Sequence, residues 1–135
     1  MNSAVADGFD KDPYVRNHPH AEPFWRAAAA GRLILPRCRS CGRAHWYPRP
    51  FCPLCHAGDL DWIDATGQGS IYSFSVMRRA KPEYVVALVT LDEGPMVMAN
   101  LVDCDPQSLA IGQPVKVRFV PTPEGRHVPA FTPAG

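Results

Sequence analysis

The sequence predicts a mainly β protein in which a short helix and a cysteine-rich segment precede a small five-stranded barrel. Four cysteines form two C-x2-C pairs between Cys38 and Cys55, and five β-rich segments with turn signals between them follow over residues 69–131. The 135-residue chain is 46% hydrophobic and 20% charged, which is ordinary for a globular protein of one or two small domains.

The first twenty residues carry prolines and scattered charges and show no apolar period. Such a stretch buries too little surface to offset the entropy of ordering its backbone. We therefore expect residues 1–20 to be a flexible arm in the unbound protein.

A short helix is expected from Glu22 to Gly31, where the sequence reads EPFWRAAAAG. Pro23 suits a first helical turn, the alanines favour a helix, and the closing glycine suits a C-terminal cap. A helix of this length is marginal in water, so Phe24 and Trp25 must pack against something. Both the neighbouring cysteine segment and another subunit are open as that partner.

The cysteine segment follows a short strand predicted over residues 32–37. Its ligand candidates are Cys38, Cys41, Cys52 and Cys55. Two thiolates separated by two residues point from one tight turn at the same ion, and two such turns close a tetrahedron of sulfurs around zinc. A closed four-sulfur site leaves no position for water or substrate, so the zinc would be structural. A single redox-active iron is the alternative occupant.

Ten residues separate the two cysteine pairs, enough for a hairpin between the two turns. Trp46 and Tyr47 within them would shield the metal or present an aromatic surface. His45 and His56 lie close enough in sequence to compete as ligands. Because four cysteines already satisfy the ion, we expect both histidines to be solvated or to lie behind the ligands.

The predicted barrel strands cover residues 69–79, 83–92, 96–103, 114–121 and 128–131. In the first strand, Tyr72, Phe74 and Val76 alternate with Ile71 and two serines, a half-buried pattern of period two. The second is nearly continuous in apolar residues and is expected to be central. Residues 105–109 resemble one helical turn between the third and fourth strands. Five strands interrupted there by a helix form the layout of an OB-fold.

These motifs together resemble the DUF35 family of acyl-CoA-associated OB-fold proteins over residues 22–132. The resemblance rests on GRLILPRCRSCGRAHWYPRPFCPLC, GQGSIYSFSV, YVVALVTLDEGP and NLVDCDPQSLAIGQPVKV. It implies a helical segment, a rubredoxin-like zinc ribbon and a C-terminal OB-fold, here divided into an arm (1–20), a helix plus ribbon (21–63) and a barrel (64–135). One departure is visible, since His56 stands where many zinc knuckles have glycine.

The resemblance also implies a function. Family members associate with thiolase-like enzymes, including the aldolases of steroid side-chain breakdown, and some occur with MaoC-like hydratases. We therefore expect a non-catalytic accessory subunit in a hetero-oligomer that handles acyl-CoA in lipid metabolism. The family's zinc ligands match the four cysteines, and no family catalytic residue maps onto this chain. Possible CoA or partner contacts are Phe24, Trp25, Trp46, Tyr47, Arg78, Arg79 and Lys81.

The basic residues among these follow the first barrel strand, where they would meet CoA phosphates or the acidic face of a partner, or simply form a solvated loop. The remaining cysteine, Cys104, is flanked by Asp103 and Asp105, whose charges raise a thiol pKa. His127 is the only histidine in the C-terminal half, and no pattern places it near Cys104. We expect no nucleophilic catalysis.

The charge balance bears on the alternatives. Net charge is +1 and the pI is about 7.7, so no strong field draws the chain to nucleic acid or to a membrane. Binding of single-stranded nucleic acid is the alternative function, because ribbons and OB-folds both occur in such proteins. With no apolar span and no secretory signal, we expect a cytoplasmic protein with reduced thiols.

Overall fold

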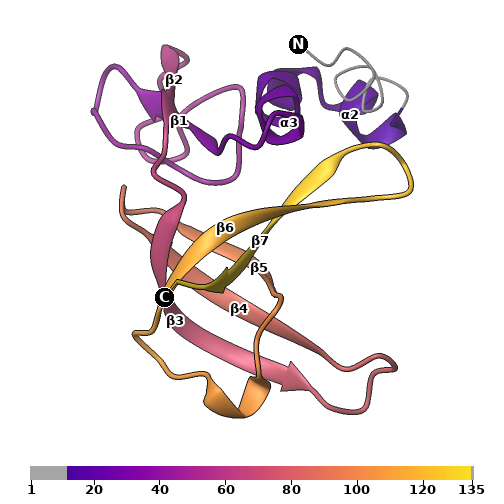
Figure 1. Cartoon of the computed structure of the whole chain (residues 1–135). Coiled ribbons are helices and arrows are strands. Elements are labelled where there is room, and N and C mark those ends of the chain that lie inside the picture. Colours follow the sequence, from indigo (N-terminus) through magenta and orange to yellow (C-terminus); the bar gives the residue numbers. More distant parts are fainter. Residues whose placement is uncertain (1–11, 135) are drawn as a thin grey trace.

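Helices and a two-stranded ribbon lie against one end of a β-barrel in the computed structural model, which describes residues 12–134 (Figure 1). The described helical segments are α2 (Pro13–Asn17), the 3-10 turn η2 (Pro19–Ala21), α3 (Glu22–Ala29) and the 3-10 turn η3 (Pro106–Ser108). The described strands are β1 (Ile34–Cys38), β2 (Leu60–Asp64), β3 (Gln68–Met77), β4 (Tyr84–Leu91), β5 (Met96–Leu101), β6 (Pro114–Pro121) and β7 (His127–Pro133). None of these helices has the length and apolarity that crossing a bilayer requires.

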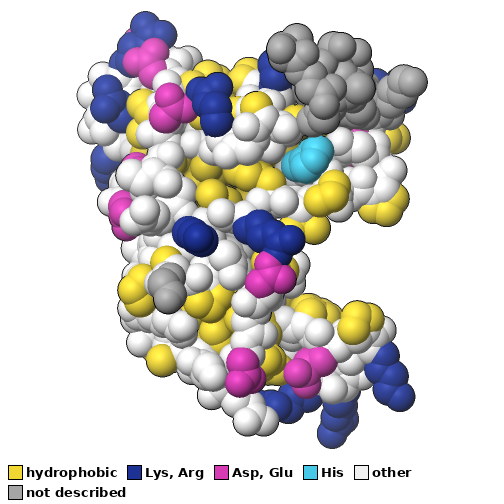
Figure 2. All heavy atoms as spheres, viewed as in Figure 1, with side chains coloured by type: hydrophobic (Ala, Val, Ile, Leu, Met, Phe, Trp, Pro, Cys, Tyr) yellow, Lys and Arg dark blue, Asp and Glu magenta, His cyan; other side chains and the backbone are white. Residues whose placement is uncertain are grey.

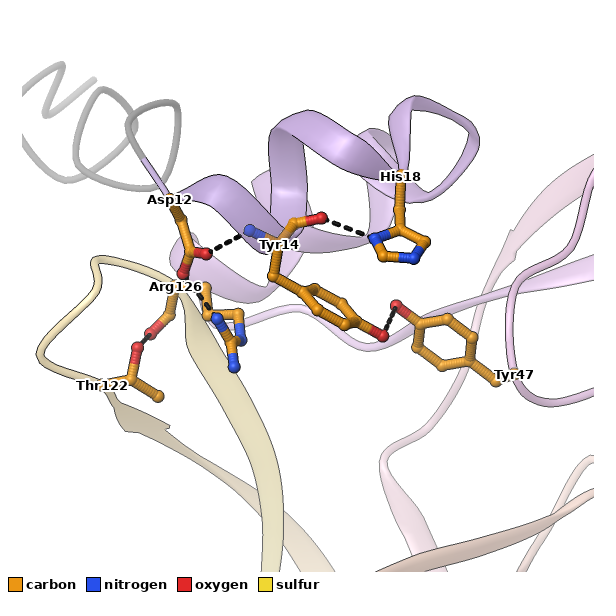
Figure 3. A network of polar contacts seen from close by, with 6 residues as sticks. All are labelled: Asp12, Tyr14, His18, Tyr47, Thr122 and Arg126. Carbon is orange, nitrogen blue, oxygen red and sulfur yellow. Dashed lines mark hydrogen bonds and ion pairs between the residues drawn. The ribbon is translucent and has the colours of Figure 1, made fainter.

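Helix α2 differs from the flexible arm expected over residues 1–20, of which residues 1–11 lie outside the described part. Asp12 caps this helix, because its carboxylate accepts a hydrogen bond from the Tyr14 backbone N–H at 2.8 Å. The same buried carboxylate pairs with Arg126 Nη1 at 2.7 Å (Figure 3). This ion pair joins residues 114 positions apart, so a pattern search along the chain does not reveal it.

Helix α3 confirms the helix expected over residues 22–31. Gly31 follows it with a φ of 81°, the left-handed conformation that a glycine cap supplies. Phe24 and Trp25 are buried, and the Phe24 ring lies edge-on to Trp46 with centroids 5.0 Å apart. The ring centroids of Tyr47 and Trp25 lie 6.5 Å apart. Within this chain, the ribbon therefore packs against both helix aromatics, and Trp25 also contacts Tyr14 and Arg126.

The ribbon sheet consists of β1 and β2, which pair antiparallel along their whole length. Strand β2 was not expected. The insert between the cysteine pairs does not form the expected hairpin, since it shows only an isolated bridge between Arg37 and Ala44. Pro48 and Pro50 have no N–H to donate, which interrupts a ladder through this insert.

The barrel is closed in the order β3-β4-β5-β7-β6 (Figure 1). Neighbouring strands pair antiparallel except β5 and β7, which meet in parallel at Leu101 and Phe131. The η3 turn lies between β5 and β6 in the chain. All five predicted strands and the helical turn are present, which confirms the OB-fold.

A bulge in β3 changes which of its side chains face the core. The register with β4 shifts between Ile71 and Ser73, leaving Tyr72 as the extra residue. Ile71 is buried, Tyr72 is 57% exposed, and Phe74 and Val76 are partly buried against the core. The strict alternation expected for this strand is therefore wrong at Tyr72, because the bulge reverses the alternation.

One hydrophobic core joins the helices, ribbon and barrel. The same buried cluster contains Val15 and Trp25 of the helices, Leu35 of the ribbon, and Ile71 and Phe131 of the barrel. The β6–β7 hairpin extends from the barrel to the helices (Figure 1). Because the parts share a core, the barrel fixes the position of the ribbon.

Candidate metal centre and neighbouring surfaces

The four cysteines of the two C-x2-C pairs come together at the end of the ribbon sheet where residues 39–59 connect β1 to β2. Their sulfur atoms all lie within 4.8 Å of one another. Cys38 Sγ is 3.5 Å from Cys55 Sγ, and Cys41 Sγ is 3.8 Å from Cys52 Sγ. A zinc–sulfur bond of about 2.3 Å places tetrahedral sulfurs about 3.8 Å apart, so the cluster has the size of a zinc site. The donor set is complete, which makes the zinc structural.

The two knuckles have the same backbone geometry. Gly42 N–H donates to the Cys38 carbonyl at 2.8 Å, and His56 N–H donates to the Cys52 carbonyl at 2.8 Å. Gly42 has a φ of 77° and His56 a φ of 69°. The substitution of histidine for glycine therefore leaves the turn unchanged and places a side chain in a left-handed conformation that favours glycine.

Backbone donors prepare the sulfurs for metal. The N–H of Cys41 lies 3.4 Å from Cys38 Sγ, and the N–H of Leu54 lies 3.4 Å from Cys52 Sγ. A hydrogen bond from the backbone N–H of Arg43 is the main cause that lowers the pKa of Cys41 to about 6. Because zinc binds thiolates, the lowered pKa values of Cys38 and Cys41 favour the ligating form of these two sulfurs, whereas the neighbouring thiols raise the pKa of Cys55 to about 11.

The ribbon histidines occupy different environments, and neither belongs to the ligand cluster. His56 is exposed, as expected. His45 is only 4% exposed, and both of its ring nitrogens are buried without a hydrogen-bond partner among the described residues. Burial, followed by the charge of Arg49, lowers the pKa of His45. His45 therefore differs from the solvated or supporting histidine that the sequence predicts, because its ring is buried and unpaired among the described residues.

The predicted aromatic contacts form one cluster between α3 and the ribbon. Its members are Phe24, Trp25, Trp46 and Tyr47. Tyr14 extends the cluster, with its hydroxyl 3.4 Å from that of Tyr47 (Figure 3). Burial and the Tyr14 hydroxyl raise the pKa of Tyr47. Arg126 stacks 4.8 Å over the Tyr14 ring. Trp46 and Tyr47 are partly buried and Tyr14 is exposed, so these three residues form the accessible side of this cluster.

The predicted basic contacts lie elsewhere. Arg78, Arg79 and Lys81 are exposed in the β3–β4 loop, at the end of the barrel away from the ribbon (Figure 1). Figure 2 shows the molecule hollowed between this loop and the β6–β7 hairpin. A hollow of about 600 Å³ is lined by residues of three segments, 83–85, 100–104 and 128–130, together with Pro106 and Val120. The structure therefore does not bring the basic and aromatic contacts into one site.

The candidate nucleophile lacks activation. Cys104 lines this hollow, and burial, followed by the charge of Asp105, raises the pKa of its thiol. Among the described residues no hydrogen bond joins Cys104 to His127, whose Nδ1 is buried without a partner. A thiol with a raised pKa and no base is a poor nucleophile.

A four-cysteine ribbon packed on a five-stranded OB barrel defines the class of zinc-ribbon OB-fold proteins. Residues 25–61 match the family model described as "ChsH2, rubredoxin-like zinc ribbon domain", and residues 62–120 match "ChsH2, C-terminal OB-fold domain". A "DUF35 domain-containing scaffold protein" of Methanothermobacter thermautotrophicus is 39% identical over 90 residues, which cover 62% of this chain and 68% of the relative. This chain belongs to the DUF35 family.

Two further likenesses concern proteins of acyl-CoA enzymes. A "Probable enoyl-CoA hydratase alpha subunit" of Thermomonospora curvata is 37% identical over 117 residues, which cover 82% of this chain but only 37% of that protein. This chain thus spans little more than a third of that relative. Among solved structures, a chain of the "Ltp2-ChsH2(DUF35) aldolase" superimposes with a TM-score of 0.74 at 35% identity, covering 86% of this chain and 95% of that one.

Proposed function

We propose that this chain is a non-catalytic accessory subunit of an enzyme that acts on acyl-CoA thioesters, and that it binds a thiolase-type enzyme such as a thiolase or a steroid side-chain aldolase. One observation carries the proposal. The likeness to the chain of the Ltp2-ChsH2(DUF35) aldolase covers nearly all of that chain, ribbon and barrel together. A hydratase is the second candidate partner, favoured by the likeness to the probable enoyl-CoA hydratase alpha subunit.

The chemistry of the described residues supports an accessory role. The four sulfurs close the metal site, so zinc has no free position at which to polarise a thioester. Cys104 has a raised pKa, and His127, the histidine of the C-terminal half, forms no hydrogen bond with it among the described residues. Catalysis would therefore come from the partner subunit.

The hollow beside the β3–β4 loop is the surface that best suits an acyl-CoA. Its walls include Tyr84, Val102 and Val128, which offer apolar contact. Residues 78–82 directly precede the lining residue Glu83, so the basic loop lies at the edge of this hollow. Exposed guanidinium and ammonium groups there would meet phosphates while the acyl chain lies on the apolar wall.

Coexpression with a thiolase-type aldolase tests the function. We expect a stable complex by size exclusion, with turnover of acyl-CoA by the complex and none by this chain alone. Turnover by the isolated chain, or the failure of thiolase-type and hydratase partners alike to bind, would contradict the proposal. Affinity for single-stranded nucleic acid that falls steeply as salt is raised would favour the alternative function.

Substitution of the loop tests the acyl-CoA surface. Replacing Arg78, Arg79 and Lys81 with Ala should raise the KM of the complex for acyl-CoA several-fold and leave complex formation intact. The control is the double variant Arg37→Ala/Lys116→Ala, which removes two exposed positive charges outside the hollow. An equal KM for acyl-CoA in the two variants would show that the loop does not contact the substrate.

A further inference from the structure

A second groove lies between the ribbon and the turn that joins β4 to β5. Its volume is about 730 Å³. The ribbon contributes Arg43, His45, Trp46 and Leu54 to its lining, and the barrel contributes residues 93–96. None of these four barrel residues lines the hollow beside the β3–β4 loop, although β5 leads from one surface to the other, since Met96 lines the groove and Asn100 lines the hollow.

Two buried polar groups in this groove lack partners among the described residues. Both ring nitrogens of His45 are unpaired on the ribbon side. On the barrel side, Glu93 Oε2 accepts from the Thr66 backbone N–H at 2.9 Å, while its buried Oε1 has no partner. A neutral imidazole needs one donor and one acceptor, and the carboxylate oxygen needs a donor. Buried polar groups are normally satisfied, so these two indicate a missing binding partner.

The surface around the two groups combines apolar contact with a free positive charge. Leu54 is 48% exposed and Met96 is 43% exposed on opposite walls of the groove. Arg43 is engaged with the Cys41 thiol. The exposed Arg49 forms no ion pair among the described residues. The groove therefore favours a partner with an apolar side chain and one negative charge.

Although the barrel is closed, strand β5 leaves one stretch beside the groove without a neighbouring strand on its β7 side. Its residues 96–100 pair with β4 on one side, and β7 joins the other side only at Leu101. Met98 in the middle of this edge is 69% exposed. Unpaired backbone groups along such an edge bind extended chains by adding a strand.

We propose that an extended peptide segment of the partner subunit lies in this groove, with its backbone between His45 and Glu93, an apolar side chain on Leu54 and Met96, and an acidic side chain at Arg49. The three unpaired atoms of His45 and Glu93 require two donors and one acceptor, which the N–H and C=O groups of successive peptide bonds in an extended segment supply. Past Met96 the same segment continues along the β5 edge. The inference rests on the proposed function, because it assumes the partner enzyme, and it identifies where on this chain that enzyme is held.

Photo-crosslinking in the coexpressed complex tests the site. A benzoylphenylalanine introduced in place of Leu54 or Met96 should crosslink to one contiguous partner peptide that contains Asp or Glu, read by mass spectrometry. The control position is Tyr72, which is 57% exposed and outside the groove. We expect no crosslink to the same peptide from that position.

Affinity measurements with the purified partner give a second readout. Arg49→Glu and Met96→Asp should each weaken binding about tenfold, the usual effect of disrupting a central interface side chain. Arg37→Glu reverses a charge outside the groove and should bind as the parent does. Equal zinc content and equal unfolding midpoints would show that all three variants are folded.

The outcomes separate this inference from the proposed function. If the complex forms but only the Tyr72 position crosslinks to the partner, the peptide does not bind in the groove, and the accessory role still stands. No complex at all overturns both. If acyl-CoA without partner protein shifts the ring resonances of His45 in NMR spectra, the groove is a small-molecule site and the peptide inference fails.

Discussion

The second zinc knuckle gives a sharp test of how backbone conformation contributes to the stability of the ribbon. His56 occupies a left-handed conformation with a φ of 69°, which costs an L-residue about 1–2 kcal/mol. Glycine avoids this strain but loses about 0.5–1 kcal/mol through its larger backbone entropy. Glycine also lacks the imidazole that packs near the Phe51 ring, at a centroid separation of 6.4 Å. We therefore expect His56→Gly to raise the free energy of unfolding by about 0.5–1 kcal/mol.

Urea unfolding at a fixed free zinc concentration measures this gain, because zinc binding itself contributes to stability. For a slope of about 1.5 kcal/mol per molar urea, the midpoint should rise by about 0.3–0.7 M. The matched control is Gly42→His in the first knuckle, where φ is 77° and an added Cβ meets no atom within 4 Å. That variant should lose the same amount, and the double exchange should return to the parent value.

A midpoint for His56→Gly at or below that of the parent would refute the reasoning if Gly42→His is destabilised as expected. The His56 side chain would then contribute a contact that outweighs its backbone strain. Equal, unchanged midpoints in both variants would instead show that the left-handed position carries no measurable cost in either knuckle.

Three further predictions address the arm, the metal and the barrel. Asp12→Ala removes both the cap of α2 and the partner of Arg126, so it should lower the free energy of unfolding by about 2–3 kcal/mol. Asp12→Asn retains the cap, so its loss should be about 1 kcal/mol smaller. Equal losses for the two variants in urea unfolding would contradict the capping role. Cys41→Ser should reduce bound zinc well below one per chain by metal analysis, and full occupancy would contradict the ligand set. Gly69→Ala places a Cβ 2.4 Å from a β4 carbonyl oxygen, so it should lower the free energy of unfolding by about 1–3 kcal/mol and lower the Tm. Gly58→Ala has open space around it and should leave the Tm unchanged. Equal Tm values for the two variants would contradict this packing.

Local patterns in the sequence were sufficient for the metal centre and most of the fold. Ligand spacing within one turn is a local property, so the C-x2-C pairs predict the sulfur cluster. Apolar, β-rich segments between turn signals likewise predict all five barrel strands, and residues 105–109 predict the helical turn found at 106–108. The helix at 22–29 follows from its proline, alanines and closing glycine.

The features that sequence reasoning missed depend on contacts between distant residues. The fixed start of α2 depends on Arg126 in the β6–β7 turn, and Asp12 alone gives no sign of it. Strand β2 exists because β1 offers an edge beside the metal, and its own sequence, LDWID, has little apolar alternation. The unpaired groups at His45 and Glu93 face one groove only because the shared core packs the ribbon on the barrel.

The separation of the aromatic and basic surfaces limits how one chain can serve an enzyme complex. The aromatic cluster and the ribbon groove lie at one end of the molecule and the basic loop lies at the other (Figure 1), with the hollow between that loop and the β6–β7 hairpin (Figure 2). One shared core joins the two ends, so neither moves without the other. A partner held at the ribbon would therefore find the hollow at a fixed distance and orientation, which is the condition for positioning a substrate without performing chemistry on it.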